Sequence, residues 1–118
     1  MLNLNPTTLA AVVDQAMIDA ANHPRWLNAI NRAVVELVSN PWIERGDHGL
    51  IIGSTSGNVY SANGVCQCKA FENGNACWHR AAARLVRLHD EKIIANQERA
   101  AKLARAAAAE AALNECFA

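Results

Sequence analysis

The chain has 118 residues, and its 11 Lys and Arg residues balance its 11 Asp and Glu residues, which removes the argument for indiscriminate polyanion binding. The hydrophobic fraction is 52%, but 24 of those residues are alanine, so the larger apolar side chains suffice for one modest core. No apolar run approaches the roughly 18 residues of a membrane span, and the first residues lack a signal-peptide pattern, so we expect a cytoplasmic protein with no membrane partner.

Two short helices are predicted in the first 40 residues. Asn5 can cap the first helix, with Pro6 at its first position, and apolar residues recur at helical spacing as far as Ala20. The second helix begins at about Pro24 and ends before Pro41, because the residue before a proline disfavours the helical conformation. Two short amphipathic helices with a tight break between them are typical of a helical hairpin.

This helical pair has two interpretations. A helix-turn-helix DNA reader needs several basic or amide groups on the exposed face of its second helix, where this chain offers Asn28, Asn31 and Arg32. A packing scaffold for the rest of the chain needs no such groups. We favour the scaffold.

Short strands are predicted in the middle of the chain, at Trp42-Ile43, residues 49–53 and residues 58–61. The segment 54–57, Ser-Thr-Ser-Gly, fits a hairpin loop between the last two strands, and Asn63-Gly64 is a further turn signal. These features indicate a small antiparallel hairpin or meander.

One long helix is predicted from about Asn75 to the end, because no Gly or Pro follows Gly74. One interruption is considered, near His89 and Asp90. Residues 106–112 are almost all alanine, the strongest helix former, and this tail has little to bury on its own.

A cluster of potential metal ligands lies where the predicted strands meet the long helix. Cys66 and Cys68 form a Cys-x-Cys pair, and Cys77 and His79 form a Cys-x-His pair after an interval of eight residues. Three thiolates and one neutral imidazole are a set that tetrahedral structural Zn²⁺ prefers, and such soft ligands disfavour Ca²⁺ and Mg²⁺. The amides at the start of the long helix favour a thiolate at Cys77. The sequence therefore predicts a structural zinc site with no open catalytic position.

Two alternatives remain for this cluster. Cys66 and Cys68 could instead form a redox pair, and His89 could replace His79 as the imidazole ligand. We prefer zinc with His79, because three cysteines and this histidine fall within fourteen positions of a chain that has four of each. The fourth cysteine, Cys116, is interpreted as a free thiol.

The spacing of these ligands resembles that of the SWIM zinc finger. The likeness covers roughly residues 49–88, from a hairpin with Tyr60 in its second strand, through both ligand pairs, into an Ala-rich helix. It implies that Cys66, Cys68, Cys77 and His79 are the zinc ligands, and that the module binds DNA or another protein. Trp78 stands between Cys and His where relatives often have lysine, and we interpret it as a packing residue that covers the metal site.

Basic residues follow one side of the predicted helix. Between Arg80 and Arg105 there are seven basic residues against three acidic ones. The stripe begins with Arg80, Arg84 and Arg87, directly after the zinc ligands, and it could lie along a phosphate backbone. We predict a nucleic-acid-binding accessory or regulatory factor that prefers DNA to RNA and is associated with the nucleoid. The competing interpretation of the stripe is a solvated charged face.

A second hypothesis makes the chain a protein-interaction adaptor, or a small regulator or inhibitor, of the kind that a phage or mobile element encodes. It would act through its helices. Alanine side chains allow a close approach, so residues 100–112 could pair with a partner helix or with a second copy, forming a homodimer.

The sequence as a whole predicts an α+β fold with two N-terminal helices, a small antiparallel sheet, a zinc site and a long C-terminal helix. We divide it into a helical hairpin extension (1–40), a SWIM-like zinc-binding module (41–90) and an Ala-rich helical tail (91–118). No Gly-rich phosphate loop, nucleophile elbow or deaminase signature occurs, so we expect a protein that is not an enzyme.

Overall fold

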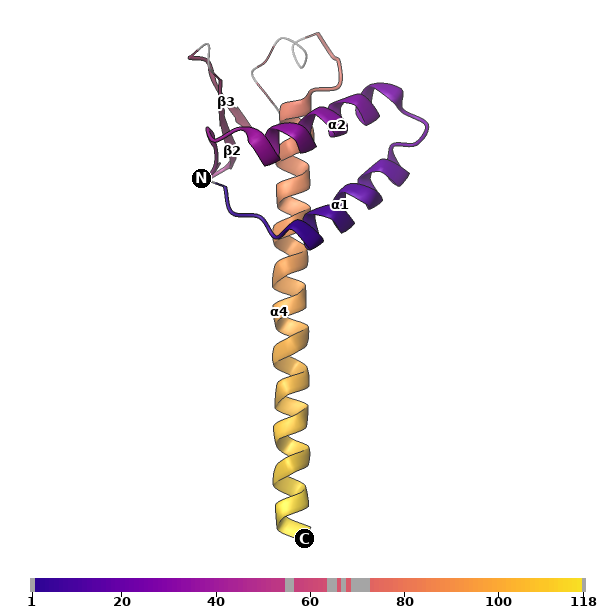
Figure 1. Cartoon of the computed structure of the whole chain (residues 1–118), viewed down its shortest axis with the longest axis vertical. Helices are drawn as coiled ribbons and strands as arrows, with labels where there is room; N and C mark the ends of the chain where they lie inside the picture. Colours follow the sequence, from indigo (N-terminus) through magenta and orange to yellow (C-terminus); the bar gives the residue numbers. More distant parts are fainter. Residues whose placement is uncertain (1, 55–56, 64–65, 67, 69–72, 118) are drawn as a thin grey trace.

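Figure 1 shows the chain as a computed structural model, which describes residues 2–54, 57–63, 66, 68 and 73–117. Its elements are α1 (Pro6–Asp19), α2 (Pro24–Ser39), β1 (Ile43–Gly46), β2 (Gly49–Gly53), β3 (Val59–Ala62) and α4 (Trp78–Phe117). The predicted α+β class and the order of the elements are confirmed.

The first two helices begin where local sequence signals place them. The Asn5 side chain accepts a hydrogen bond from the Thr8 main-chain N–H at 3.0 Å, and Pro6 occupies the first turn of α1. Pro24 has the same role at the start of α2. At the other end of α2, Asn40 donates to the Gly53 carbonyl at 3.1 Å, which ties the helix to the sheet.

The three strands form an antiparallel sheet in the order β1-β2-β3. Ile43 pairs with Ile52, and Leu50 pairs with Ala62; all four side chains are buried. β1 is longer than predicted, because residues 44–46 continue the pairing with β2. The predicted hairpin loop at 54–57 and the turn at Asn63-Gly64 include Thr55, Ser56 and Gly64, which lie outside the described residues.

Gly49 is required at the turn between β1 and β2. Its φ of +137° is one that residues with a side chain rarely adopt, and a Cβ atom there would collide with the Ala62 carbonyl. The tight approach of β2 to β3 at this point therefore depends on glycine.

The core forms around the first half of α4. In Figure 1, α1, α2 and the sheet gather around one end of this helix, and residues from every element share one buried cluster. The larger aliphatic members of the cluster are Leu9, Val12, Ile30, Leu37, Ile43, Leu50, Ile52, Leu85 and Val86. Alanines fill much of the remainder, which allows the helices to pack closely.

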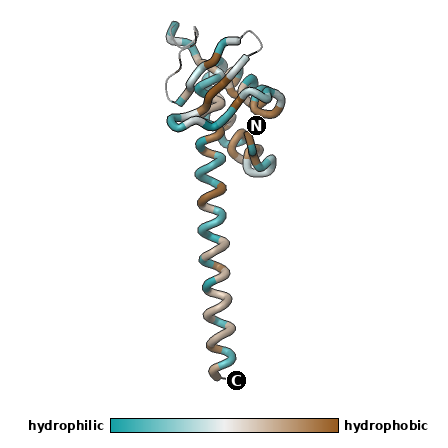
Figure 2. The backbone as a smooth tube through the Cα atoms, turned by 90° about the vertical axis from the view of Figure 1, so that its left-hand side faces the viewer, coloured by the Kyte–Doolittle hydropathy of each residue, from teal (hydrophilic) through white to brown (hydrophobic). Residues whose placement is uncertain are grey.

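The second half of α4 projects from this core. The molecule measures 69 × 32 × 22 Å, and residues 94–117 are all exposed to solvent. Figure 2 shows this segment as a single straight helix of mixed hydropathy. No helix among the described residues is both long enough and apolar enough to cross a bilayer.

The long helix differs from its prediction at two points. It begins at Trp78, a few residues later than predicted, because the Cys77 carbonyl accepts the first helical hydrogen bond, from the Ala81 N–H at 3.1 Å. It also continues through His89 and Asp90, so the interruption considered there is absent. His89 is 3% exposed, and its Nε2 accepts a hydrogen bond from the Asn5 N–H at 2.9 Å.

Arg45 fixes β1 and the N-terminal segment against α4. Its guanidinium donates to both carboxylate oxygens of Asp90, at 2.8 and 3.0 Å, and to the Asn3 carbonyl at 3.0 Å. This hydrogen-bonded arginine lowers the pKa of Asp90. This pair could not be predicted from local sequence patterns, because its members are 45 positions apart.

Replacing a buried leucine of α4 tests whether the first half of this helix belongs to the core and the second half projects into solvent. Leu85 is 1% exposed and Ile94 is 55% exposed. We expect Leu85→Ala to lower the free energy of unfolding by about 2–5 kcal/mol, because it leaves a cavity in the core. Ile94→Ala should change it by no more than about 0.5 kcal/mol. Urea unfolding of the zinc-loaded protein, followed by circular dichroism, measures both; equal effects would contradict the described core.

Candidate metal centre

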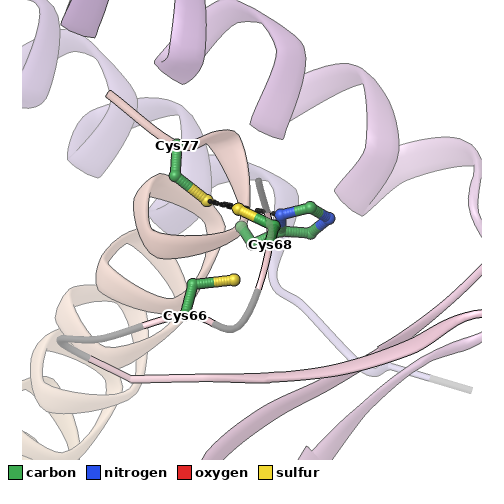
Figure 3. Close-up of side chains that lie close together, drawn as sticks. Cys66, Cys68 and Cys77 are labelled. Carbon is green, nitrogen blue, oxygen red and sulfur yellow. Dashed lines mark hydrogen bonds between the residues drawn. The ribbon is translucent and has the colours of Figure 1, made fainter. Parts of the chain in front are cut away.

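The four predicted ligands converge at the first turn of α4. Cys66 and Cys68 lie after β3, Cys77 directly precedes α4, and His79 is its second residue. Figure 3 shows the side chains of Cys68 and Cys77 pointing toward each other, with Cys66 beside them. Their sulfur atoms and one ring nitrogen of His79 all lie within 4.8 Å of one another.

The individual distances show which atoms face the centre. The Cys68 and Cys77 sulfurs are 3.0 Å apart, and the Cys77 sulfur is 3.3 Å from Nδ1 of His79. All four side chains are buried, with Cys77 only 1% exposed. Nδ1 is therefore the histidine nitrogen placed for binding an ion together with the cysteines.

Main-chain amides contribute to the electrostatics of the cluster. The Arg80 N–H donates to the Cys77 sulfur, so this side chain caps the N-terminus of α4, as predicted from its position there. The Cys68 N–H donates likewise to the Cys66 sulfur. Both hydrogen bonds favour the thiolate form, which is the form that binds metal.

Burial acts in the opposite direction. Desolvation raises the pKa of Cys66, and together with the neighbouring Cys68 thiol it raises the pKa of Cys77 to about 12. Burial and the positive charge of Arg32 lower the pKa of His79, so its imidazole is neutral at pH 7. A cation at the centre would compensate the desolvation of three thiolates. The four cluster residues supply no such positive charge themselves.

The donor geometry fits a zinc ion. Zn–S bonds of about 2.3 Å and Zn–N bonds of about 2.0–2.1 Å place tetrahedral donors roughly 3.5–3.8 Å apart. The donor separations of 3.0 Å, 3.3 Å and at most 4.8 Å bracket that range. Shifts of about 1 Å or less would bring all four to one ion.

Aromatic rings enclose His79 on two sides. The Trp78 ring lies 4.1 Å from it and the Tyr60 ring 4.7 Å, measured between centroids. The Arg32 guanidinium lies over the Trp78 ring, 5.4 Å from its centroid. These contacts agree with the interpretation of Trp78 as a packing residue, and they hold the histidine ring in place. Neither Tyr60 nor Arg32 was placed at the metal site from sequence: Tyr60 was identified as the aromatic residue of the SWIM-like hairpin, and Arg32 as an exposed residue of the second helix.

The other predicted site residues lie outside the cluster. His89, the competing imidazole, is held by Asn5 and is not part of the four-ligand group. Cys116 is exposed near the end of α4. Arg84 and Arg87 are exposed on α4, whereas Arg80 is partly buried with its guanidinium 5.4 Å from the centroid of the Trp26 ring. The roles of these arginines stay predictions.

Comparison with known families supports the zinc assignment. Residues 60–86 match the family model of the SWIM zinc finger, and this segment contains all four cluster residues. The resemblance seen in the sequence is confirmed for this part of the chain. No curated protein and no solved structure matches the chain. The family match and the Cys₃His cluster together indicate a zinc-binding protein.

Replacing single cysteines tests the ligand assignment. We expect the protein to bind about one Zn²⁺ per chain and to lose its near-UV circular dichroism on chelation, because metal binding is coupled to folding. Cys77→Ser should weaken zinc binding by at least about 100-fold. Competition with a colorimetric chelator measures this. Cys116→Ser is the matched control, and equal zinc affinity in the two variants would contradict the assignment.

Proton release on zinc binding provides a second test. The raised pKa values of Cys66 and Cys77 mean that these thiols are protonated at pH 7 without metal, whereas His79 is already neutral. Because zinc binds thiolates, about three protons should leave per ion, and the apparent affinity should fall as the pH is lowered. Titration calorimetry in two buffers of different ionisation enthalpy counts these protons. Release of one proton or none would contradict a three-cysteine site.

Proposed function

We propose that the chain is a non-enzymatic zinc-binding protein that binds nucleic acid, preferably DNA, through a groove along the first half of α4. This groove, called here the basic groove, has a volume of about 1190 Å³, and its lining includes Arg80, which directly follows His79 in the chain. Its polar and aromatic lining consists of Gln15, Asp19, His23, Trp26, His48, Asn63, Arg80, Arg84, Arg87, Glu91 and Lys92.

Three parts of the fold form the basic groove. Its floor is the exposed stripe of α4 that contains Arg84 and Arg87. One wall is α1 with its corner to α2, which includes His23 and Trp26, and the other is the turn between β1 and β2, with His48. A helix lined with arginine between two raised walls is a suitable surface for a phosphate backbone.

The charge of the groove differs from that of the chain as a whole. The chain has a formal net charge of zero, but the groove is lined by four Arg and Lys residues against Asp19 and Glu91. Its local excess is therefore two positive charges, with histidines neutral. The anionic partner is thus drawn to one surface and not to the whole protein.

Arg84 and Arg87 are the groove arginines best placed for phosphate contact. Arg84 makes no ion pair within the described part of the chain. Arg87 lies 3.9 Å from Glu91, and both side chains are about two-thirds exposed. Such a surface pair contributes little to stability, so Arg87 can exchange its partner for a phosphate at small cost. Arg80, stacked on Trp26, instead positions the wall of the groove.

Salt-dependent binding tests the proposal. We expect the zinc-loaded protein to bind a short DNA duplex, with an affinity that falls steeply between low and moderate salt as counterions are released. The double variant Arg84→Gln/Arg87→Gln should reduce the slope of log K against log salt by about two. Fluorescence anisotropy at several salt concentrations, on DNA and on RNA of the same sequence, measures both quantities.

A matched variant removes the same charge from another part of α4. Lys102→Gln/Arg105→Gln deletes two positive charges from the projecting half of the helix, where both residues are exposed. Its salt slope should equal that of the unmodified protein. If the two double variants weaken binding equally, attraction is not localised in the basic groove. If neither DNA nor RNA binds at low salt, the proposed function is wrong.

Reduced thiols are needed for this function. Zinc binding uses three cysteine thiolates, and Cys116 is free and exposed. Such a set is typical of a reducing compartment. We therefore place the protein in the cytoplasm, at the nucleoid when it is bound to DNA.

A further inference from the structure

The projecting half of α4 presents large apolar side chains on one face. Leu103 is 65% exposed, Leu113 is 58% exposed and Phe117 is 84% exposed. At 3.6 residues per turn, these three positions lie within about 80° of one another around the helix axis. A monomer leaves this face in water along the whole segment.

Leu103, Leu113 and Phe117 fall in one heptad register, whose other positions are mostly polar. Successive members are separated alternately by four and three residues, which is the spacing of the two core positions of a coiled coil. These residues, called here the C-terminal seam, are Lys92, Asn96, Arg99, Leu103, Ala106, Glu110, Leu113 and Phe117. The helix is continuous through all of them.

We propose that the C-terminal seam binds the same seam of a second copy in antiparallel orientation, forming a homodimer. An antiparallel pair centred between residues 104 and 105 matches every seam residue with another seam residue of the partner. The facing residues are Lys92 and Phe117, Asn96 and Leu113, Arg99 and Glu110, and Leu103 and Ala106. Each combination occurs twice by the two-fold symmetry.

Charge complementarity selects the antiparallel orientation. Neither Arg99 nor Glu110 has an ion-pair partner among the described residues. Antiparallel pairing places Arg99 opposite Glu110 at two symmetric points. Parallel pairing would place Arg99 opposite Arg99 and Glu110 opposite Glu110, and like charges in a coiled-coil core repel.

Side-chain size selects the same orientation. Leu103 faces Ala106 on both sides of the two-fold axis, so a large residue lies against a small one and the helices keep an even separation. Parallel pairing would alternate a leucine pair with an alanine pair. At each end of the seam, the Lys92 stem and ammonium can lie against the Phe117 ring, which combines apolar contact with cation–π attraction.

The dimer places its two zinc modules at opposite ends. The paired segment from residue 92 to residue 117 is about 39 Å long, at 1.5 Å per residue. The basic groove of each copy lies beyond the end of this segment except for Lys92, which belongs to both the groove and the seam. This arrangement does not depend on nucleic-acid binding, so the dimer and the proposed function can be tested separately.

Charge reversal within the seam tests the proposal. Sedimentation equilibrium of the zinc-loaded full chain should show a monomer–dimer equilibrium in the micromolar range. Arg99→Glu alone and Glu110→Arg alone should each raise the dimer dissociation constant roughly tenfold or more, because each places like charges opposite one another. The double variant Arg99→Glu/Glu110→Arg should restore dimerisation. None of these changes touches the buried core.

The control reverses a charge outside the seam. Arg105 is exposed on another side of the same helix, and Arg105→Glu alters the net charge as Arg99→Glu does. It should leave the dissociation constant unchanged. A monomer at high micromolar concentration would overturn the dimer. Single reversals at 99 and 110 that have no effect would overturn the antiparallel orientation.

Spin labels on the native Cys116 measure the orientation directly. With zinc bound, this is the exposed thiol available for labelling. Antiparallel pairing places the two copies of Cys116 about 35 Å apart along the helix axis. Parallel pairing would bring them to a separation on the order of the 10 Å between packed helices. A short electron–electron distance would therefore overturn the proposal.

Discussion

The burial of four ligand atoms at the first turn of α4 is the constraint on which the rest of the structure depends. The apolar core is small and contains many alanines, and the cluster occupies the junction between the sheet and the helices. Without a cation, desolvation holds the buried Cys66 and Cys77 thiols in their neutral form. A bound ion converts this unfavourable burial into a cross-link between the segment after β3 and α4. The metal thereby supplies cohesion that the few large side chains do not.

Local signals in the sequence were sufficient for the helices and for the ligand cluster. Asn5 with Pro6, the proline at 24 and the paired cysteine spacings all act over a few residues, so their outcome is readable from the chain. The interactions that could not be predicted connect distant positions. His89, considered as a ligand, is bonded to Asn5, which is 84 residues away. Trp26 lies in the predicted second helix, and only the packing of α2 beside α4 places it under Arg80.

The long helix has two parts with different physical support. From Trp78 to about Ile93 it is stabilised by the core, where Leu85 and Val86 are buried. Residues 94–117 are all exposed, and helix formation there depends on alanine propensity and on whatever packs against the seam. The alanine-rich composition made the tail look uniform in the sequence. Its seam becomes visible when the few large and charged side chains are placed on a continuous helix.

A single rigid helix also links the zinc site, the basic groove and the seam. Cys77 and His79 fix the start of α4, and Arg84 and Arg87 follow within the next turns, so their positions relative to the metal are set by helix geometry. The same helix continues into the seam without a break. In an antiparallel dimer, the two grooves would consequently have a fixed separation and a fixed relative direction. If both proposals hold, such a dimer would bind two segments of nucleic acid at a defined distance, which a flexible linker between the modules would not allow.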